Sequence, residues 1–94
     1  MNWRKIPHPT YGNFGGREKR AGSGKKPIDW MDAVFEKHDL ELKAAKNEVE
    51  VDEADCMLVE RLLEGNPKEL LFPIYGRIYR WGALIIFRIK CSRL

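Results

Sequence analysis

The chain has 94 residues, of which 44% are hydrophobic and 33% charged, with a formal net charge of +3. This size and composition are typical of a small globular domain with one modest core, and they exclude a disordered chain. We therefore expect one domain spanning residues 1–94. Two cysteines, Cys56 and Cys91, exclude a framework of several disulfides, although a single bridge stays open.

The net charge conceals a division of the chain into three parts. Residues 1–27 carry seven Lys or Arg against one Glu, a charge of +6. Residues 28–67 carry four against twelve Asp or Glu, a charge of −8, and residues 68–94 carry six against one, a charge of +5. The basic ends either bind an anionic surface such as phospholipid or nucleic acid, or neutralise the acidic middle within the fold.

The first ten residues form a short arm in which Pro7 and Pro9 prevent a long helix. No apolar segment typical of a signal peptide is present, and no run is long enough to cross a bilayer. We therefore expect an intracellular or virion-associated protein rather than a classically secreted one. Trp3 is a candidate anchor at a lipid interface, and its alternative is a plug at the edge of the core.

Residues 11–26 form a loop in which five of sixteen residues are Gly. Glycines allow positive φ and close backbone approach, so the loop could hold an anion through N–H groups or a cation through carbonyls. The order Gly-Lys-Ser/Thr of a phosphate-binding loop is missing. A flexible linker is the alternative.

A helix is predicted from the stretch Pro27–Asp39 onward, with Asp29 as its N-cap. Apolar residues follow at helical spacing, at Met31, Val34, Phe35, Leu42 and Ala45. His38 lies on this apolar stripe. A buried imidazole without a partner would cost about 1–3 kcal/mol, so the position predicts a partner for His38.

A second helix is predicted over residues 51–64, with an apolar face of Val51, Leu58 and Leu62. Asp55 lies on that same face. If the two helices pack antiparallel, His38 and Asp55 can meet, and each explains the buried position of the other. The alternative to a catalytic role is an ion pair that only holds the two helices in register.

The C-terminal stretch 74–94 mixes apolar residues with Arg77, Arg80 and Arg88. This pattern predicts a basic amphipathic helix, which could lie on a lipid interface or pack its apolar side on the core. We favour the core, because a chain of this size needs it. A strand over 85–90 stays open, since apolar and basic residues alternate there. Leu70, Leu71 and Phe72 predict a short helical turn before Pro73.

The order of these motifs resembles the phospholipase A2 family. The matching residues are Tyr11-Gly12-Asn13-Phe14-Gly15-Gly16, Gly22-Ser23-Gly24, then Pro27, Asp29, Asp32, His38 and Asp39. The stretch from Ala54-Asp55 to Leu58-Val59 resembles the second catalytic helix, most closely that of the cysteine-poor phospholipase domain in parvovirus minor capsid proteins. The resemblance covers about half of the chain, residues 11–63.

The resemblance implies a catalytic pair of His38 and Asp55 and a Ca²⁺ site. Ca²⁺ prefers hard oxygen ligands. The implied ligands are the Asp39 carboxylate and loop carbonyls of Phe14 and Gly16, with Gly22 as a further candidate. We expect the membrane interface to include Trp3, Arg17, Lys19, Arg20 and Trp30.

The sequence also departs from the family pattern. The loop before Pro27 is about four residues longer than in the secreted enzymes, with residues 17–20 inserted, and the disulfide cysteines of the family are absent. Leu42 stands where secreted members have a Tyr that supports the catalytic Asp, and Tyr75 or Tyr79 could substitute for it. The N-terminal helix that binds lipid in secreted members is replaced by the short arm.

Together these observations predict a mostly α fold with two antiparallel catalytic helices, a preceding calcium-binding loop and a basic C-terminal helix. The predicted activity is Ca²⁺-dependent hydrolysis of the sn-2 ester of phospholipids at a membrane surface, in a larger viral or cellular assembly and without specific nucleic-acid binding. Two alternatives stay open. One is an inactive member of the fold that binds a membrane or protein partner, and the other is a basic nucleic-acid-binding virion protein.

Overall fold

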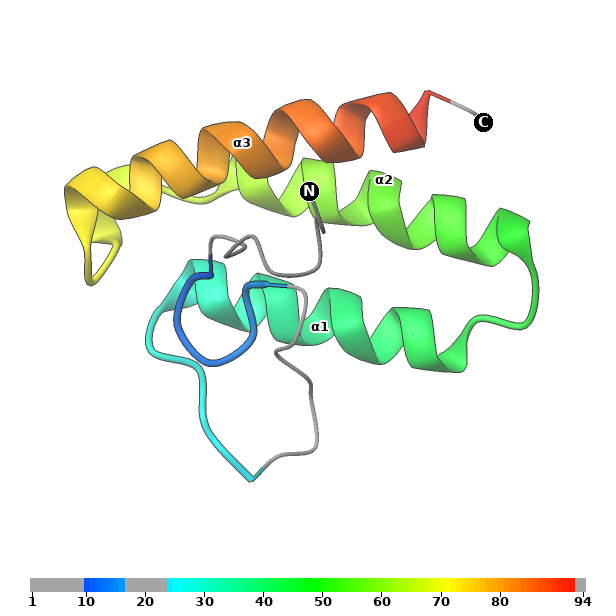
Figure 1. Cartoon of the computed structure of the whole chain (residues 1–94), viewed down its shortest axis with the longest axis horizontal. Coiled ribbons are helices and arrows are strands. Elements are labelled where there is room, and N and C mark those ends of the chain that lie inside the picture. Colours follow the sequence, from blue (N-terminus) through cyan, green and yellow to red (C-terminus); the bar gives the residue numbers. More distant parts are fainter. Residues whose placement is uncertain (1–9, 17–23, 93–94) are drawn as a thin grey trace, which may run out of the picture.

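The computed structural model describes residues 10–16 and 24–92. They form three α helices, α1 (Trp30–Ala44), α2 (Glu48–Glu64) and α3 (Pro73–Cys91), with a short 3₁₀ helix, η2 (Pro67–Glu69), before α3. In Figure 1, α1 and α2 run antiparallel, and α3 lies along α2 and runs in the same direction as α1. The predicted mostly α fold class is confirmed.

The helix ends follow from local capping. The Asp29 carboxylate accepts a hydrogen bond from the Asp32 N–H at 2.9 Å, as predicted for the N-cap of α1. Asn47 caps α2 in the same way, accepting from the Glu50 N–H at 2.9 Å, so α2 begins three residues earlier than its apolar face predicts. Pro73 begins α3, where its missing N–H costs no helical hydrogen bond.

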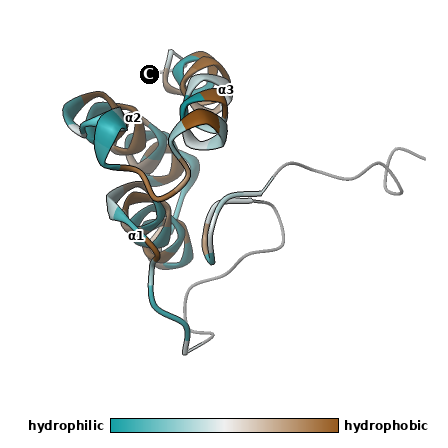
Figure 2. Cartoon of the chain, turned by 90° about the vertical axis from the view of Figure 1, so that its left-hand side faces the viewer, coloured by the Kyte–Doolittle hydropathy of each residue, from teal (hydrophilic) through white to brown (hydrophobic). Residues whose placement is uncertain are grey.

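The core lies where α2 packs against both other helices. Figure 2 views the helices nearly along their axes and shows α2 beside both α1 and α3, with the 10–16 loop beside α1 and below α3. Two leucines of α2, Leu58 and Leu62, are fully buried. They form one apolar cluster with residues of the loop, α1, the η2–α3 connection and α3, namely Tyr11, Phe14, Met31, Phe35, Leu70 and Ala83.

Three local expectations for the C-terminal third are resolved. The short helical turn lies at Pro67–Glu69, so its prediction at residues 70–72 is wrong; Asn66 caps the earlier turn through a hydrogen bond from the Lys68 N–H at 2.9 Å. The strand over 85–90 is excluded, because α3 continues to Cys91. Cys56 and Cys91 form the single disulfide left open by the sequence, which ties the end of α3 to α2.

The C-terminal helix packs on the core with one side only. Its only fully buried positions are the small residues Gly76 and Ala83, and most of its large apolar side chains are exposed. The preference for a core helix therefore holds for one side of α3, where Tyr79, Ala83 and Phe87 pack with the core, and is wrong for the apolar side chains on its other side. Within the described residues, no helix combines the length and apolar character needed to cross a membrane.

Candidate functional site

The site is built around a buried pair of side chains from α1 and α2. The His38 Nε2 atom lies 2.8 Å from the Asp55 Oδ1 atom. His38 is 7% exposed and Asp55 4% exposed. The predicted contact between His38 and Asp55, the two polar residues on the apolar faces of their helices, is confirmed. Each partner satisfies the other, as buried polar groups require.

The orientation of the His38 ring follows from this bond. Because Asp55 accepts a hydrogen bond at Nε2, the neutral ring carries its proton there and its lone pair at Nδ1. The described residues offer no hydrogen-bond partner for Nδ1. The Phe87 ring from α3 packs edge-on against the imidazole, with 5.0 Å between ring centroids. The imidazole is thus held from two sides while Nδ1 keeps its lone pair.

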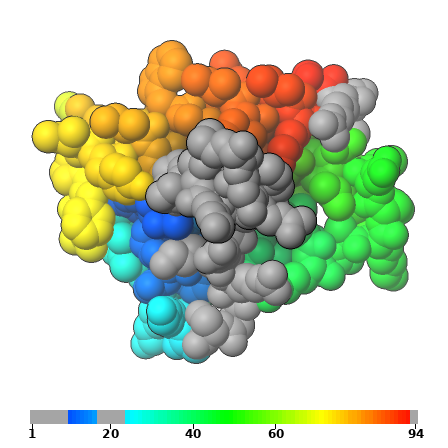
Figure 3. Space-filling view, in the orientation of Figure 1, coloured from blue at the N-terminus to red at the C-terminus, as the bar shows by residue number. Residues whose placement is uncertain are grey.

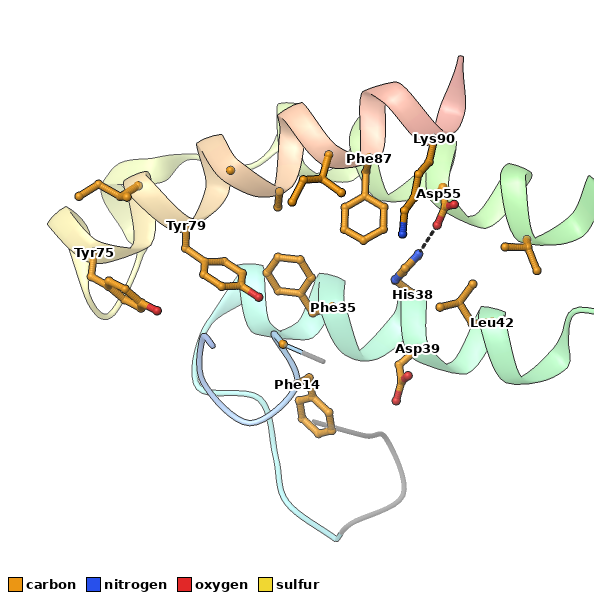
Figure 4. Close-up of a pocket in the computed structure, with 16 residues that line it drawn as sticks. Phe14, Phe35, His38, Asp39, Leu42, Asp55, Tyr75, Tyr79, Phe87 and Lys90 are labelled. Atoms are coloured by element: carbon orange, nitrogen blue, oxygen red, sulfur yellow. Dashed lines mark hydrogen bonds and ion pairs between the residues drawn. The ribbon is translucent and has the colours of Figure 1, made fainter. Parts of the chain in front are cut away.

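His38 and Asp55 line a pocket of about 850 Å³, drawn in Figure 4. Walls come from the 10–16 loop and from all three helices. Most of the lining is apolar or aromatic, with Asp39 and Lys90 as further charged members. The apolar lining includes Phe14, Phe35, Leu42, Val51, Tyr79, Ile86 and Phe87. An apolar pocket with a few convergent polar groups is typical of a small-molecule site.

The first glycines of the loop form a tight turn beside this pocket. Tyr11 and Gly15 exchange backbone hydrogen bonds of 2.6 and 2.8 Å. Gly12 has φ of +58°, and a Cβ there would lie 2.5 Å from the Asp32 carboxylate. Only glycine fits this position, because both the backbone conformation and the close approach exclude a side chain.

Asp32, in the first turn of α1, holds the loop in place. It is fully buried, and its carboxylate accepts hydrogen bonds from the N–H groups of Asn13, Phe14 and Ile28 at 2.9–3.0 Å. The carboxylate thereby fixes the loop on the first turn of α1. The motif comparison included Asp32 but gave it no role, because its partners are backbone groups that the sequence does not reveal.

Asp29 links three segments around the same helix end. Besides capping α1, its carboxylate accepts hydrogen bonds from the Tyr11 hydroxyl and from the Leu71 N–H, the latter at 3.1 Å. Burial and the nearby Asp29 carboxylate raise the pKa of Tyr11 above its usual range. Tyr11 therefore keeps its proton at physiological pH and donates a hydrogen bond to Asp29.

The implied Ca²⁺ ligands can be compared with this geometry. Phe14, Gly16 and Asp39 line the same pocket as His38. One carboxylate and loop carbonyls are hard oxygen donors of the kind that Ca²⁺ takes, so the residues present fit the ion. Gly22 lies outside the described residues. Across residues 10–16 and 24–92, no cluster of three or more His, Cys, Asp or Glu could hold a metal, so a Ca²⁺ site here would need backbone carbonyls.

Of the residues expected at a membrane interface, Trp3, Arg17, Lys19 and Arg20 lie outside the described residues. Trp30 is half-buried at the start of α1. Its indole N–H donates to the Asn66 carbonyl at 2.9 Å, and its ring lies so close to Gly65 that a Cβ there would be 2.1 Å away. In this structure Trp30 joins α1 to the end of α2, and it does not line the pocket.

The two tyrosines considered as support for Asp55 lie elsewhere. The Tyr75 hydroxyl donates to the Thr10 carbonyl, and the Tyr79 ring packs edge-on against Phe35 at 5.4 Å between centroids. In the described part of the chain, neither hydrogen-bonds to Asp55. Sequence reasoning also missed Phe87, because nothing in the pattern of α3 indicates which of its apolar residues reaches the imidazole.

Comparisons of the chain with protein-family models, with curated proteins and with solved structures give no match.

Proposed function

We propose that this chain is a calcium-dependent phospholipase A2 that hydrolyses the sn-2 ester of phospholipids. The observation that carries the proposal is the buried His38–Asp55 pair at 2.8 Å, on the wall of a mostly apolar pocket that Asp39 and the glycine-rich loop also line. A structural ion pair alone needs neither the pocket nor the adjacent carboxylate.

The pair suits general base catalysis. The Nδ1 lone pair of His38 can take a proton from a water molecule, which then attacks the ester carbonyl. Asp55, bound at Nε2, keeps the ring in the required tautomer and stabilises the imidazolium that forms. The same imidazolium returns the proton to the leaving alcohol. No covalent intermediate is needed, so no nucleophilic serine or cysteine is required.

Asp39 and the carbonyls of Phe14 and Gly16 would hold Ca²⁺, which when bound polarises the ester carbonyl and stabilises negative charge on its oxygen. Asp32 serves this arrangement indirectly. By binding the Asn13 and Phe14 N–H groups, it fixes the backbone that must present those carbonyls.

The apolar lining supports a substrate with a hydrocarbon chain. Aromatic and aliphatic side chains from the loop, α1 and α3 surround the space beside His38 (Figure 4). Transfer of an acyl chain from water into such a pocket gains about 25 cal/mol per Å² of apolar surface removed from water. The pocket therefore favours a fatty ester over a polar one.

A hydrolysis assay tests the proposal. Phospholipid with a labelled sn-2 acyl chain, in mixed micelles with Ca²⁺, should release labelled fatty acid in the presence of the protein. His38→Gln and Asp39→Asn should each lower the rate by about 10²–10⁴-fold, and chelation by EGTA should stop release. Glu53→Gln, an exposed acid on α2, is the matched control and should retain the rate.

Circular dichroism spectra should confirm that the two site variants keep their helices. Full release by folded His38→Gln and Asp39→Asn proteins, or release from the sn-1 position alone, would refute the proposal.

A second candidate function is lipid binding without turnover. The observation that favours it is the exposed apolar face of α3, which a soluble enzyme does not need. The assay above separates the two functions, because binding without turnover predicts vesicle association and no release of fatty acid.

A further inference from the structure

One face of α3 is apolar and uncovered. Five residues recur there every three or four positions, and each is 49–81% exposed, namely Ile74, Ile78, Trp81, Ile85 and Ile89. We call these residues the α3 stripe. In Figure 3, α3 forms the upper edge of the molecule along its whole length. A contiguous row of this kind indicates an interaction surface, because isolated exposed apolar residues are ordinary and rows are not.

The charges beside the stripe have a single sign. α3 carries Arg77, Arg80, Arg88 and Lys90, and no Asp or Glu lies between Pro73 and Cys91. Arg77 and Arg88 are exposed and fall on the helix surface directly next to the stripe. Arg80 instead donates to the Leu62 carbonyl at 3.0 Å and so belongs to the packing with α2.

The stripe adjoins the pocket of the candidate site. Ile78 belongs to both. Gly82 and Ile86 lie on the helix surface between the stripe and the buried side of α3, and they also line the pocket. Figure 4 shows α3 as the pocket wall facing α1. A surface that covers the stripe would therefore lie next to the pocket containing His38.

We propose that the α3 stripe docks α3 lengthwise onto an anionic phospholipid surface, with Arg77 and Arg88 at the head groups and the pocket beside the bilayer. A helix with an apolar face and a basic flank, and without acidic residues, matches such a surface in both hydrophobicity and charge. The proposal deepens the proposed function, because it identifies the surface from which the substrate enters.

Pairing of α3 with a second copy of this chain fits less well. A two-fold interface places the same patch on both subunits, so in an antiparallel pair of α3 helices the arginines beside one stripe would face those of the other. Like charges in such a position repel, whereas an anionic membrane neutralises them.

The test is vesicle flotation of the full chain in EGTA, which keeps lipid intact and separates binding from hydrolysis. Vesicles of phosphatidylcholine alone are compared with vesicles containing about one-third phosphatidylglycerol. We expect binding to the anionic vesicles, and a loss of about tenfold or more in the Trp81→Glu/Ile85→Glu variant. The matched control is Val49→Glu/Leu63→Glu, two comparably exposed apolar residues of α2, which should bind as the unmodified chain does.

Three results would overturn the proposal. Equal binding by the α3 variant and the unmodified chain would show that the stripe is not the docking surface. Binding that survives in the α3 variant but disappears at high salt would indicate charge attraction alone, as for nucleic acid. If light scattering shows a stable dimer for the unmodified chain and for the control variant but a monomer for the α3 variant, the stripe would belong to an interface with a second copy. Failure of the hydrolysis assay leaves the flotation result unaffected, so the two proposals fail separately.

Discussion

The surroundings of α1 and the outer face of α3 depart from the usual burial pattern in opposite ways. Around α1, the contact with α2 buries His38 and Asp55 and the contact with the 10–16 loop buries Asp32, all at 7% exposure or less, whereas the outer face of α3 exposes five large apolar side chains. Both arrangements are unfavourable for a small domain unless something compensates. Inside, the compensation is visible, because all three buried residues are hydrogen-bonded. Outside, residues 10–16 and 24–92 provide none, and this difference is why we propose chemistry for the first region and a partner for the second.

The comparison predicts opposite responses to removal of apolar side chains. Leu62→Ala should lower the free energy of unfolding by about 3–4 kcal/mol, because Leu62 is fully buried in the cluster between the helices. Its neighbour Leu63 and the stripe residue Ile89 are 47% and 64% exposed, and their Ala variants should each cost about 0.5 kcal/mol or less. Urea unfolding measures all three. A loss of several kcal/mol in Ile89→Ala would mean that the α3 stripe is covered in solution.

The polar side of the comparison depends on Asp32. Asp32→Ala leaves the N–H groups of Asn13, Phe14 and Ile28 without their acceptor, and we expect the free energy of unfolding to fall by about 3 kcal/mol. Glu53→Gln on the exposed side of α2 is the control and should change it by about 0.5 kcal/mol or less. Hydrogen exchange should locate the loss at residues 12–14. Unchanged protection there would show that Asp32 does not hold the loop.

The disulfide joins the two regions, since Cys56 follows Asp55 directly and Cys91 ends α3. Cys56→Ser/Cys91→Ser should reduce the free energy of unfolding by about 2–3 kcal/mol, because the bridge closes a loop of 35 residues. The last turn of α3, one turn beyond Phe87, should fray first. Thermal unfolding with and without dithiothreitol provides the measurement, and the double Ser variant is the control that the reductant should leave unchanged. If dithiothreitol also leaves the thermal unfolding of the unmodified chain unchanged, the bridge does not form.

The sequence predicts the polar region better than the apolar one. His38 and Asp55 each interrupt an apolar stripe of helical period, and a polar residue on such a stripe predicts a buried partner. Asp32 carries no comparable indication, because it pairs with backbone N–H groups of a loop distant in sequence. The Gly12 approach to Asp32 is hidden for the same reason.

For α3 the sequence predicts the helix and its apolar side but not what covers that side. Periodicity identifies a face, and the number of neighbouring elements decides whether the face is buried. Here α2 already packs against both α1 and α3, and the buried residues of α3 are the small Gly76 and Ala83, while most of its larger apolar side chains are exposed. The sequence predicts the helical turn at residues 70–72, whereas it lies at Pro67–Glu69. The Asn66 cap determines where the turn begins, and the apolar residues that follow do not.

Tyr79 lies at the boundary of the two regions and gives the smallest predicted effect. It is the half-buried tyrosine of α3 that packs against Phe35, and burial, with Tyr75 and Asp32 nearby, raises its pKa from 10.0 to about 12. Above pH 10 the unfolded chain loses this proton before the folded one does, so stability must fall as pH rises toward 12 and then level off.

Between pH 9 and pH 11, the free energy of unfolding should therefore fall by about 1 kcal/mol more in the unmodified chain than in Tyr79→Phe. Urea unfolding of both proteins at the two pH values measures the difference, in which the groups that do not interact with Tyr79 cancel. Identical losses would mean that water reaches the Tyr79 hydroxyl freely. The junction of α3 with α1 would then be open, and the boundary between the buried and exposed regions would lie deeper than Tyr79.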